Sequence, residues 1–239
     1  MPAMTPTLTP LWSPLEACAQ KTLEKLEAVA VPIRIPTGAP VTTADQTAEG
    51  LILLLEGVVR IFHALAEDSQ FTMKLIRAPA ALGEVEVTQR LPWGASVEAL
   101  TPVEGLLLPA DAVREALAMD FGFTTAVLDD LARKFARTIR ASRALGFDGC
   151  EQRLIRVLLE YAEHFGRPSE EGLVIRYPLS RQRLALEIGA ARRSVDRALA
   201  ALTAEKLLSL SSKGWLVLHA PAELRARLMS GGSTGSCES

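Results

Sequence analysis

The chain has 239 residues, of which 49% are hydrophobic and 23% charged, and its net charge at pH 7 is −2. These values are typical of a globular protein and allow one large domain or two ordinary ones. The three cysteines are isolated, which argues against a disulfide framework and a CxxC metal site, and no apolar run approaches the ~20 residues of a membrane span.

The charge is distributed unevenly along the chain. Residues 1–146 hold 13 Lys and Arg against 17 Asp and Glu, a net −4, whereas residues 176–227 hold 10 against 4, a net +6. A local basic excess favours contact with the phosphates of nucleic acid. The N-terminus has no basic region followed by a continuous apolar stretch, so no secretory signal is predicted, and the isolated cysteines fit a reducing cytoplasm.

The first half of the chain predicts a domain of antiparallel strands. After a proline-rich, irregular start, a short amphipathic helix is expected near residues 14–29. Short β-type runs punctuated by Pro and Gly follow, and the clearest are 50–56, 57–63, 71–76 and 104–109. Strands spaced so closely, with no long helix between them, favour a barrel or jelly roll.

A long helix is predicted from about Phe123 to Leu145. Six of its residues are spaced 3, 4, 3, 4 and 3, which is typical of a coiled-coil seam; they are Leu128, Leu131, Phe135, Thr138, Ser142 and Leu145. We interpret the seam as a homodimer contact, because a DNA-binding motif farther along the chain would use two-fold symmetry to read paired half-sites. Alternatively, this face packs on the helix's own barrel. Residues 146–149 end the helix and form the expected hinge.

The last third predicts a small helical domain with a wing. A helix over 150–165 and a candidate strand at 173–177 precede a helix-turn-helix over 179–202 and a hairpin over 207–218. The predicted fold class is therefore α+β. Its parts are a sheet domain at 1–122, a dimerisation helix at 123–147, a winged helix-turn-helix domain at 148–230 and a flexible tail at 231–239.

The helix-turn-helix is the most informative segment. Ser180 is a good N-cap for its first helix, and Gly189 stands where the chain must turn sharply. The second helix has one apolar face with the i, i+3, i+4, i+7 spacing, formed by Val195, Ala198, Leu199 and Leu202. Polar residues of its N-terminal half are predicted to meet base edges in the major groove. These residues are Arg192, Arg193, Ser194, Asp196 and Arg197.

Arginine suits such positions because its planar fork matches the O6 and N7 acceptors of guanine, although a solvated face also carries arginines. Asp196 could orient Arg192, accept from a cytosine amine or form a helix-surface ion pair. Further DNA contacts are expected at the start of the first helix and in the wing, from Ser180, Arg181, Gln182 and Lys213. The wing lysine could equally be only solvated.

This combination resembles the CRP/FNR family of bacterial transcription regulators over roughly residues 32–219. Ser180-Arg-Gln resembles the family's Leu-Thr-Arg-Gln helix start, and Ile188-Gly its Leu-Gly turn. Arg192-Arg-Ser-Val-Asp-Arg resembles the recognition core Arg-Glu-Thr-Val-Ser-Arg. The resemblance implies a cyclic-nucleotide-binding-like barrel, a long dimerisation helix and a C-terminal winged helix-turn-helix.

The same resemblance implies that Arg192 and Arg197 read guanine and adjacent groups. The chain departs from the family pattern at two positions. Arg193 replaces the usual glutamate, and Asp196 stands where Ser or Gly is common. The preferred operator is therefore expected to differ from the family's best-known consensus.

The sensor part of the family also has a counterpart. Leu82-Gly-Glu and Trp93-Gly-Ala-Ser-Val resemble its Gly-Glu and Arg-Ser-Ala-Thr-Val segments. The resemblance implies effector contacts by Gly83, Glu84, Trp93, Gly94, Ala95, Ser96 and, on the long helix, Thr138. Trp93 replaces the arginine that would pair with a cyclic phosphate, which needs a cation or several donors to offset its lost hydration.

Binding of cyclic AMP is therefore predicted to be weak or absent. Trp93 is either a hydrophobic plug in the vacated phosphate site or a stacking surface for another ligand. A single N-terminal cysteine, Cys18, cannot hold an iron–sulfur cluster. Glu84 and Glu86 are expected to share one strand face, but no nucleophile or metal ligand stands near them in the sequence, so no enzyme is predicted.

The sequence thus predicts a homodimeric cytoplasmic regulator that binds a pseudo-palindromic operator. It has no predicted cofactor, its small-molecule effector is unidentified, and no membrane partner is expected. RNA polymerase is a further partner if the protein activates transcription. Two alternatives remain, a regulator that needs no small molecule, and a ligand-binding or protein-interaction module that does not bind DNA specifically.

Overall fold

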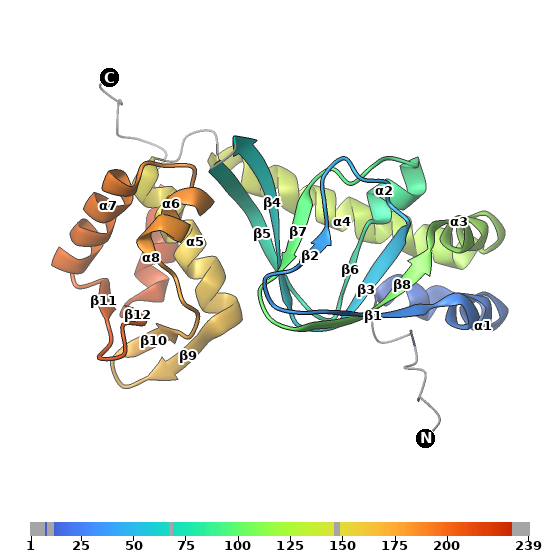
Figure 1. Cartoon of the computed structure of the whole chain (residues 1–239), viewed down its shortest axis with the longest axis horizontal. Coiled ribbons are helices and arrows are strands. Elements are labelled where there is room, and N and C mark those ends of the chain that lie inside the picture. The colour runs from blue at the N-terminus through green and yellow to red at the C-terminus, as the bar shows by residue number, and fades with distance from the viewer. Residues whose placement is uncertain (1–7, 9–11, 67–68, 146–148, 231–239) are drawn as a thin grey trace. The chain divides into compact units, whose positions relative to one another are not determined.

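The computed structural model of the protein describes residue 8 and residues 12–66, 69–145 and 149–230 (Figure 1). The chain divides into two compact units. Residues 1–62 and 76–138 form the first, and residues 63–75 and 139–239 form the second. The expected tail at 231–239 and most of the expected hinge at 146–149 lie outside the described residues. The domain boundaries expected at 122/123 and 147/148 stay predictions.

The N-terminal half consists of helical segments around two antiparallel sheets. Its elements are η2 (Ser13–Ala17), α1 (Gln20–Val29), β1 (Val31–Ile35), β2 (Pro40–Thr42), β3 (Gly50–Glu56), β4 (Val58–Ala66), β5 (Ser69–Arg77), β6 (Ala80–Leu82), α2 (Glu84–Gln89), β7 (Ser96–Ala99), β8 (Val103–Pro109), α3 (Ala110–Met119) and α4 (Phe121–Leu145). The strand orders are β1-β8-β3-β6 and β2-β7-β4-β5. The expected jelly-roll type of sheet domain is confirmed.

Strand β3 is apolar on both faces because both are buried. Leu51 and Leu53 pack into a core shared with α1, α3 and α4, whereas Ile52 and Leu54 pack into a core between the two sheets. Strand β3 pairs with β8 on one side and β6 on the other. The uninterrupted run Leu-Ile-Leu-Leu-Leu is the sequence signature of this position.

Two expectations for this half are wrong. The helix near 14–29 is interrupted, because the Ala19 amide donates to Asp120 Oδ2 at 2.7 Å and the chain is extended between η2 and α1. Glu84 and Glu86 lie on helix α2 and not on a strand. Gly83 follows β6 with a left-handed φ of +97°, which only glycine adopts at low cost, and α2 begins at the next residue.

Asp120 also fixes the start of α4. Its Oδ1 accepts from the Phe123 amide at 3.0 Å, in the manner of an N-cap. These backbone donors hold the pKa of the Asp120 carboxyl below its usual range. One side chain therefore anchors both the N-terminal segment and the long helix.

The C-terminal part is a winged helix-turn-helix. Its elements are α5 (Cys150–Phe165), β9 (Gly166–Ser169), β10 (Gly172–Ile175), α6 (Arg181–Glu187), α7 (Arg192–Ala204), β11 (Leu208–Leu210), β12 (Leu216–Leu218) and α8 (Pro221–Ser230). The strand order is β11-β12-β10-β9. The predicted helices and the β11–β12 hairpin are present, while β9 and α8 are additions that the sequence patterns did not reveal. Arg227 on α8 pairs with Glu205 after α7 and Glu151 on α5.

Candidate functional site

The helix-turn-helix begins with the predicted cap. Ser180 Oγ accepts from the Arg183 amide at 3.0 Å, and α6 ends at Glu187 with Ile188 as its C-cap. Gly189 has φ +60°, and no atom lies within 4 Å of where its Cβ would be, so the turn selects glycine for its backbone conformation and not for space. Helix α7 then starts at Arg192.

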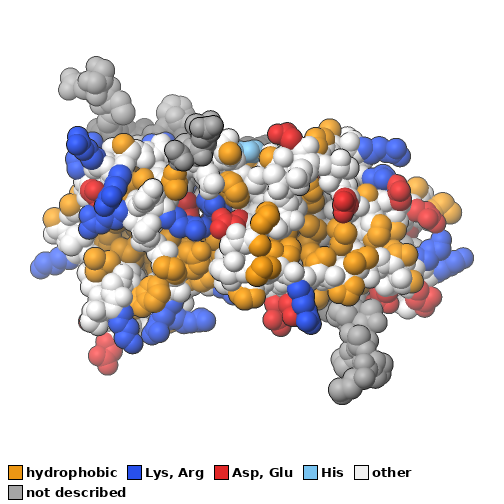
Figure 2. Space-filling view, viewed as in Figure 1, with side chains coloured by type: hydrophobic (Ala, Val, Ile, Leu, Met, Phe, Trp, Pro, Cys, Tyr) orange, Lys and Arg blue, Asp and Glu red, His pale blue; other side chains and the backbone are white. Residues whose placement is uncertain are grey.

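Helix α7 separates a buried apolar face from an exposed basic one. Its buried residues are Val195, Ala198, Leu199 and Leu202, as the periodicity predicts. Arg192, Arg193 and Arg197 are exposed, and Ser194 is partly exposed. Several Lys and Arg side chains gather over the second unit on the face that Figure 2 shows. Helix α7 therefore presents cationic hydrogen-bond donors on its exposed face, while its apolar face is packed in the core.

Asp196 forms an ion pair at the helix surface, which was one of the alternatives for this residue. Its Oδ1 accepts from Arg181 Nη1 at 2.8 Å, so the ion pair joins α7 to the first turn of α6. Arg192 is not its observed partner. Both side chains are well exposed, at 54% and 35%, so the pair can open at little cost.

The other predicted DNA contacts flank α7. Gln182 is exposed in the first turn of α6, and Lys213 is exposed in the turn of the β11–β12 wing. That turn is closed by backbone and side-chain bonds, since Ser211 and Trp215 bond to each other twice. Gly214 has φ +76° there.

A buried polar network supports the helix-turn-helix from behind, and the sequence analysis missed it. Glu187 on α6 is fully buried, and its Oε1 accepts from the Tyr161 hydroxyl at 2.6 Å and from Arg183 Nε at 2.8 Å. Burial and the adjacent Glu187 carboxylate raise the pKa of Tyr161 far above its usual range. The sequence feature that could have revealed this network is Glu187, a charged residue directly before Ile188 and three residues after Leu184, on the apolar face of the helix.

In the first unit, Trp93 is 8% exposed and packs into the core between the sheets. A Cβ at Gly83 would lie 2.7 Å from the Trp93 ring. The Trp93 amide donates to the Gln46 carbonyl at 2.9 Å. The indole is therefore part of the core, and its equivalence to the cationic partner of a cyclic phosphate stays a prediction.

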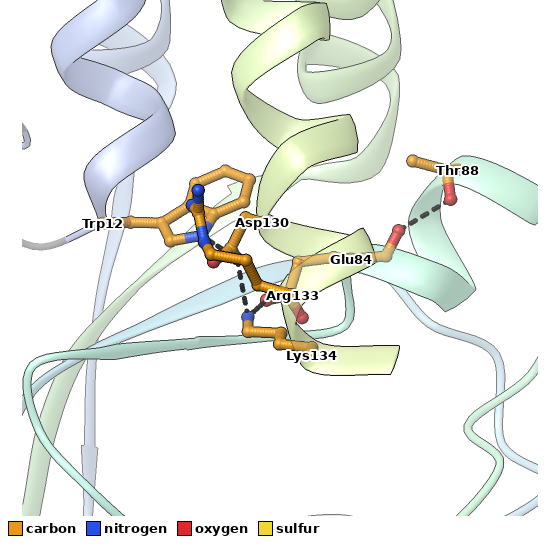
Figure 3. A network of polar contacts seen from close by, with 6 residues as sticks. All are labelled: Trp12, Glu84, Thr88, Asp130, Arg133 and Lys134. Carbon is orange, nitrogen blue, oxygen red and sulfur yellow. Dashed lines mark hydrogen bonds and ion pairs between the residues drawn. The ribbon is translucent and has the colours of Figure 1, made fainter. Parts of the chain in front are cut away.

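The polar groups beside Trp93 are already bonded within the chain. The Gly94 amide donates to Glu86 Oε1 at 3.4 Å, and Ser96 Oγ accepts from the Ala44 amide at 3.1 Å. Ala95 between them is partly exposed. Glu84 is buried and contacts Lys134 Nζ of α4 (Figure 3). Burial raises the pKa of the Glu84 carboxyl, and Lys134 opposes that rise.

The long helix α4 has two apolar faces. Phe123, Val127 and, in part, Leu131 pack on the helix-side core. Leu128 and Phe135 are 65% and 66% exposed, and Phe121, seven residues before Leu128, is also exposed. Packing on the helix's own core therefore applies in part to Leu131, while a dimer contact through the exposed Leu128 and Phe135 stays a prediction. Thr138 is exposed and donates to the Lys134 carbonyl, while the side chains of Ser142 and Leu145 lie outside the described part.

Among the described residues, no group of His, Cys, Asp and Glu side chains is arranged to hold a metal ion. No described helix is both long and apolar enough to cross a membrane.

Comparison with known proteins identifies both halves of the chain. The family model for the cyclic nucleotide-binding domain matches residues 32–120, and that for the Crp-like helix-turn-helix domain matches residues 152–227. A global nitrogen regulator of Synechocystis is 28% identical over 179 residues, which are 74% of this chain and 79% of that protein. A CRP-like cAMP-activated global transcriptional regulator of Mycobacterium tuberculosis is 26% identical over 81% of this chain and 83% of its own length.

The fold is shared with solved structures. A transcriptional regulator of the Crp/Fnr family from Eubacterium rectale superposes with a TM-score of 0.75 at 13% identity, over 92% of this chain and 99% of the other.

The buried network predicts a defined effect of Tyr161→Phe. This change removes the hydroxyl that donates to a buried carboxylate, and leaving a buried acceptor without a partner costs about 1–3 kcal/mol. We expect the free energy of unfolding to fall by that amount in urea titrations monitored by circular dichroism. Glu187→Gln should make the further loss from Tyr161→Phe smaller than in the wild type. Additive losses would contradict a direct Tyr161–Glu187 interaction.

Proposed function

The chain belongs to the CRP/FNR family of transcription regulators, and we propose that it binds a pseudo-palindromic operator as a homodimer, with α7 as recognition helix. The observation that carries the proposal is the exposed basic face of α7 opposite a buried one. In a winged helix-turn-helix such a face enters the major groove. The family binds DNA, and the protein is not an enzyme.

Within this interface, Arg192 and Arg197 read base edges and Arg193 adds a contact that the family's usual glutamate would not make. Ser180, Gln182 and Lys213 contact phosphates from the start of α6 and from the wing. Ser194 lies beside Arg197, with Oγ 3.5 Å from Nη2, and helps to aim it. Arg181 reaches phosphate once it leaves Asp196, which is then free to accept from a cytosine amine.

The homodimer is supported by the exposed apolar residues of α4. Phe121, Leu128 and Phe135 recur every seven residues, which keeps them on one stripe of the helix. Large apolar side chains this exposed at regular spacing mark an interaction surface. A second copy of α4 is self-complementary to that stripe and gives the two-fold symmetry that a palindromic operator needs.

The effector site is degenerate, and cyclic AMP is not its ligand. Trp93 fills the position of the phosphate-pairing arginine, and the Gly94 amide is bonded to the Glu86 carboxylate. An anionic phosphate would meet an indole and a carboxylate there, in place of the arginine that would offset its desolvation. This supports the interpretation of Trp93 as a hydrophobic plug. A regulator of this kind works in the cytoplasm, and RNA polymerase is its further partner if it activates transcription.

The first test is a fluorescence-anisotropy titration against DNA selected from a randomised pool, with and without cyclic AMP. We expect sequence-selective binding that cyclic AMP leaves unchanged. The affinity should fall steeply with salt, because phosphate contacts release counterions. Binding that required cyclic AMP would refute the degenerate effector site, and binding without sequence preference would refute the operator assignment.

Substitution of the proposed base-reading residues should relax specificity. Arg192→Ala and Arg197→Ala are each expected to cost about 1–3 kcal/mol of discrimination between operator and random DNA, with folding intact. Arg225→Ala, an exposed arginine on α8, is the matched control and should leave discrimination unchanged. Discrimination equal to that of the wild type in both recognition-helix variants would overturn their assignment.

The dimer contact is tested by Phe135→Asp, which places a charge in the apolar stripe. We expect the dimer dissociation constant from sedimentation equilibrium to rise at least about 30-fold, equivalent to 2 kcal/mol at a central contact. Leu91→Asp is the control, because it also places a charge on an exposed apolar residue, 50% exposed and outside α4, and it should leave the dimer dissociation constant unchanged. An unchanged monomer–dimer equilibrium in Phe135→Asp would remove this stripe from the dimer interface.

A further inference from the structure

Glu84 is a buried carboxylate whose cationic partner comes from another element of the same unit. The Glu84 side chain is 9% exposed, and Lys134 Nζ contacts its Oε1. Lys134 also binds Asp130 Oδ2 at 2.9 Å on the same helix. Figure 3 shows the ammonium lying between the two carboxylates, one from α2 and one from α4.

The network continues to the N-terminal segment. Asp130 Oδ2 accepts from Trp12 Nε1 at 3.1 Å, and the Trp12 ring packs edge-on against Phe123 at 5.8 Å between centroids. Arg133 Nη2 lies 3.6 Å from Asp130 Oδ1. Three segments that are far apart in the sequence, the N-terminal segment, α2 and α4, are therefore joined by two contacts, that of Trp12 with Asp130 and that of Glu84 with Lys134.

Burial distinguishes the Lys134–Glu84 pair from the surface pairs of this unit. A carboxylate removed from water is costly unless a cation and hydrogen bonds compensate it, so loss of the partner leaves an uncompensated buried charge. The pair of Lys25 and Glu115 has a comparable chemistry at 3.0 Å, but its side chains are 61% and 63% exposed. Such an exposed pair contributes little.

We propose that Lys134 is an internal ligand of Glu84 and a positioning residue for DNA binding. Its ammonium satisfies the carboxylate that begins α2, so α2 and α4 are held together without a small molecule. Helix α4 carries the exposed stripe of Phe121, Leu128 and Phe135, and its position sets the geometry of the dimer. The inference rests on the proposed function in that DNA binding depends on the arrangement of α4.

Among the described residues, Lys134 is the cation that contacts the Glu84 carboxylate. The Asp130 carboxylate also acts on Glu84, and its charge raises the pKa of the Glu84 carboxyl. Thr88 Oγ1 donates to the backbone carbonyl of Glu84 and not to its carboxylate. With Lys134 removed, Glu84 must either take up a proton or leave its buried position. Either change breaks the link between α2 and α4.

The test is a double-mutant cycle of Lys134→Met and Glu84→Gln, with the full-length protein and its selected operator. Each single variant should weaken operator binding by about 5- to 150-fold, the range of ordinary coupling between sites. The double variant should bind the operator no more weakly than the weaker-binding single variant, because the two changes remove the same interaction. Lys134→Arg keeps a cation and should retain most of the affinity. Lys25→Met should match the wild type.

Hydrogen exchange of the DNA-free protein gives a second readout that does not depend on DNA binding. Lys134→Met should lose amide protection in α2 and α4 together, while the winged helix-turn-helix keeps its protection. Unchanged protection and unchanged operator affinity in Lys134→Met would overturn the proposal, as would additive effects in the cycle. A wild-type protein without operator preference would instead refute the proposed function, and the exchange measurement would still decide whether Lys134 links the two helices.

Discussion

The structure of the sensor half depends on one strand that is buried on both faces. Strand β3 contributes Leu51 and Leu53 to the helix-side core and Ile52 and Leu54 to the core between the sheets. Both cores are therefore built on the same backbone, and a shift of this strand would disturb both. Strand β6, its partner, leads directly into Gly83 and Glu84. The position of Gly83 and Glu84 is thus set by a strand that is buried on both faces.

Buried carboxylates recur at the two places where function is expected. Glu84 lies at the start of α2 with Lys134 beside it, and Glu187 lies under the helix-turn-helix with Tyr161 and Arg183 beside it. An apolar residue would fill either site at lower electrostatic cost. A carboxylate gives instead a directional contact that is satisfied in one arrangement only, and each contact fixes a helix relative to its neighbour.

The sequence predicted what is local and periodic. The cap at Ser180, the turn at Gly189 and the buried face of α7 follow from short-range patterns and are present. The long helix was also recognisable, but its spacing alone could not separate Leu131, which packs partly on its own core, from Phe135, which is exposed. Helix α2 was missed because six residues are too short for a helical period to stand out, and the pairs of Glu84 with Lys134 and of Tyr161 with Glu187 join residues far apart in the sequence.

The contact between Trp93 and Gly83 also constrains how this site can change over generations. Any side chain at residue 83 would collide with the indole and would have to adopt a left-handed backbone, so the glycine is tied to the tryptophan as well as to its own conformation. Replacement of Trp93 alone would leave a cavity in the core between the sheets, and a polar residue there would have no bound ligand to compensate for it. A single replacement of Trp93 by a cationic residue would therefore lower the stability of the fold before it could provide a phosphate site.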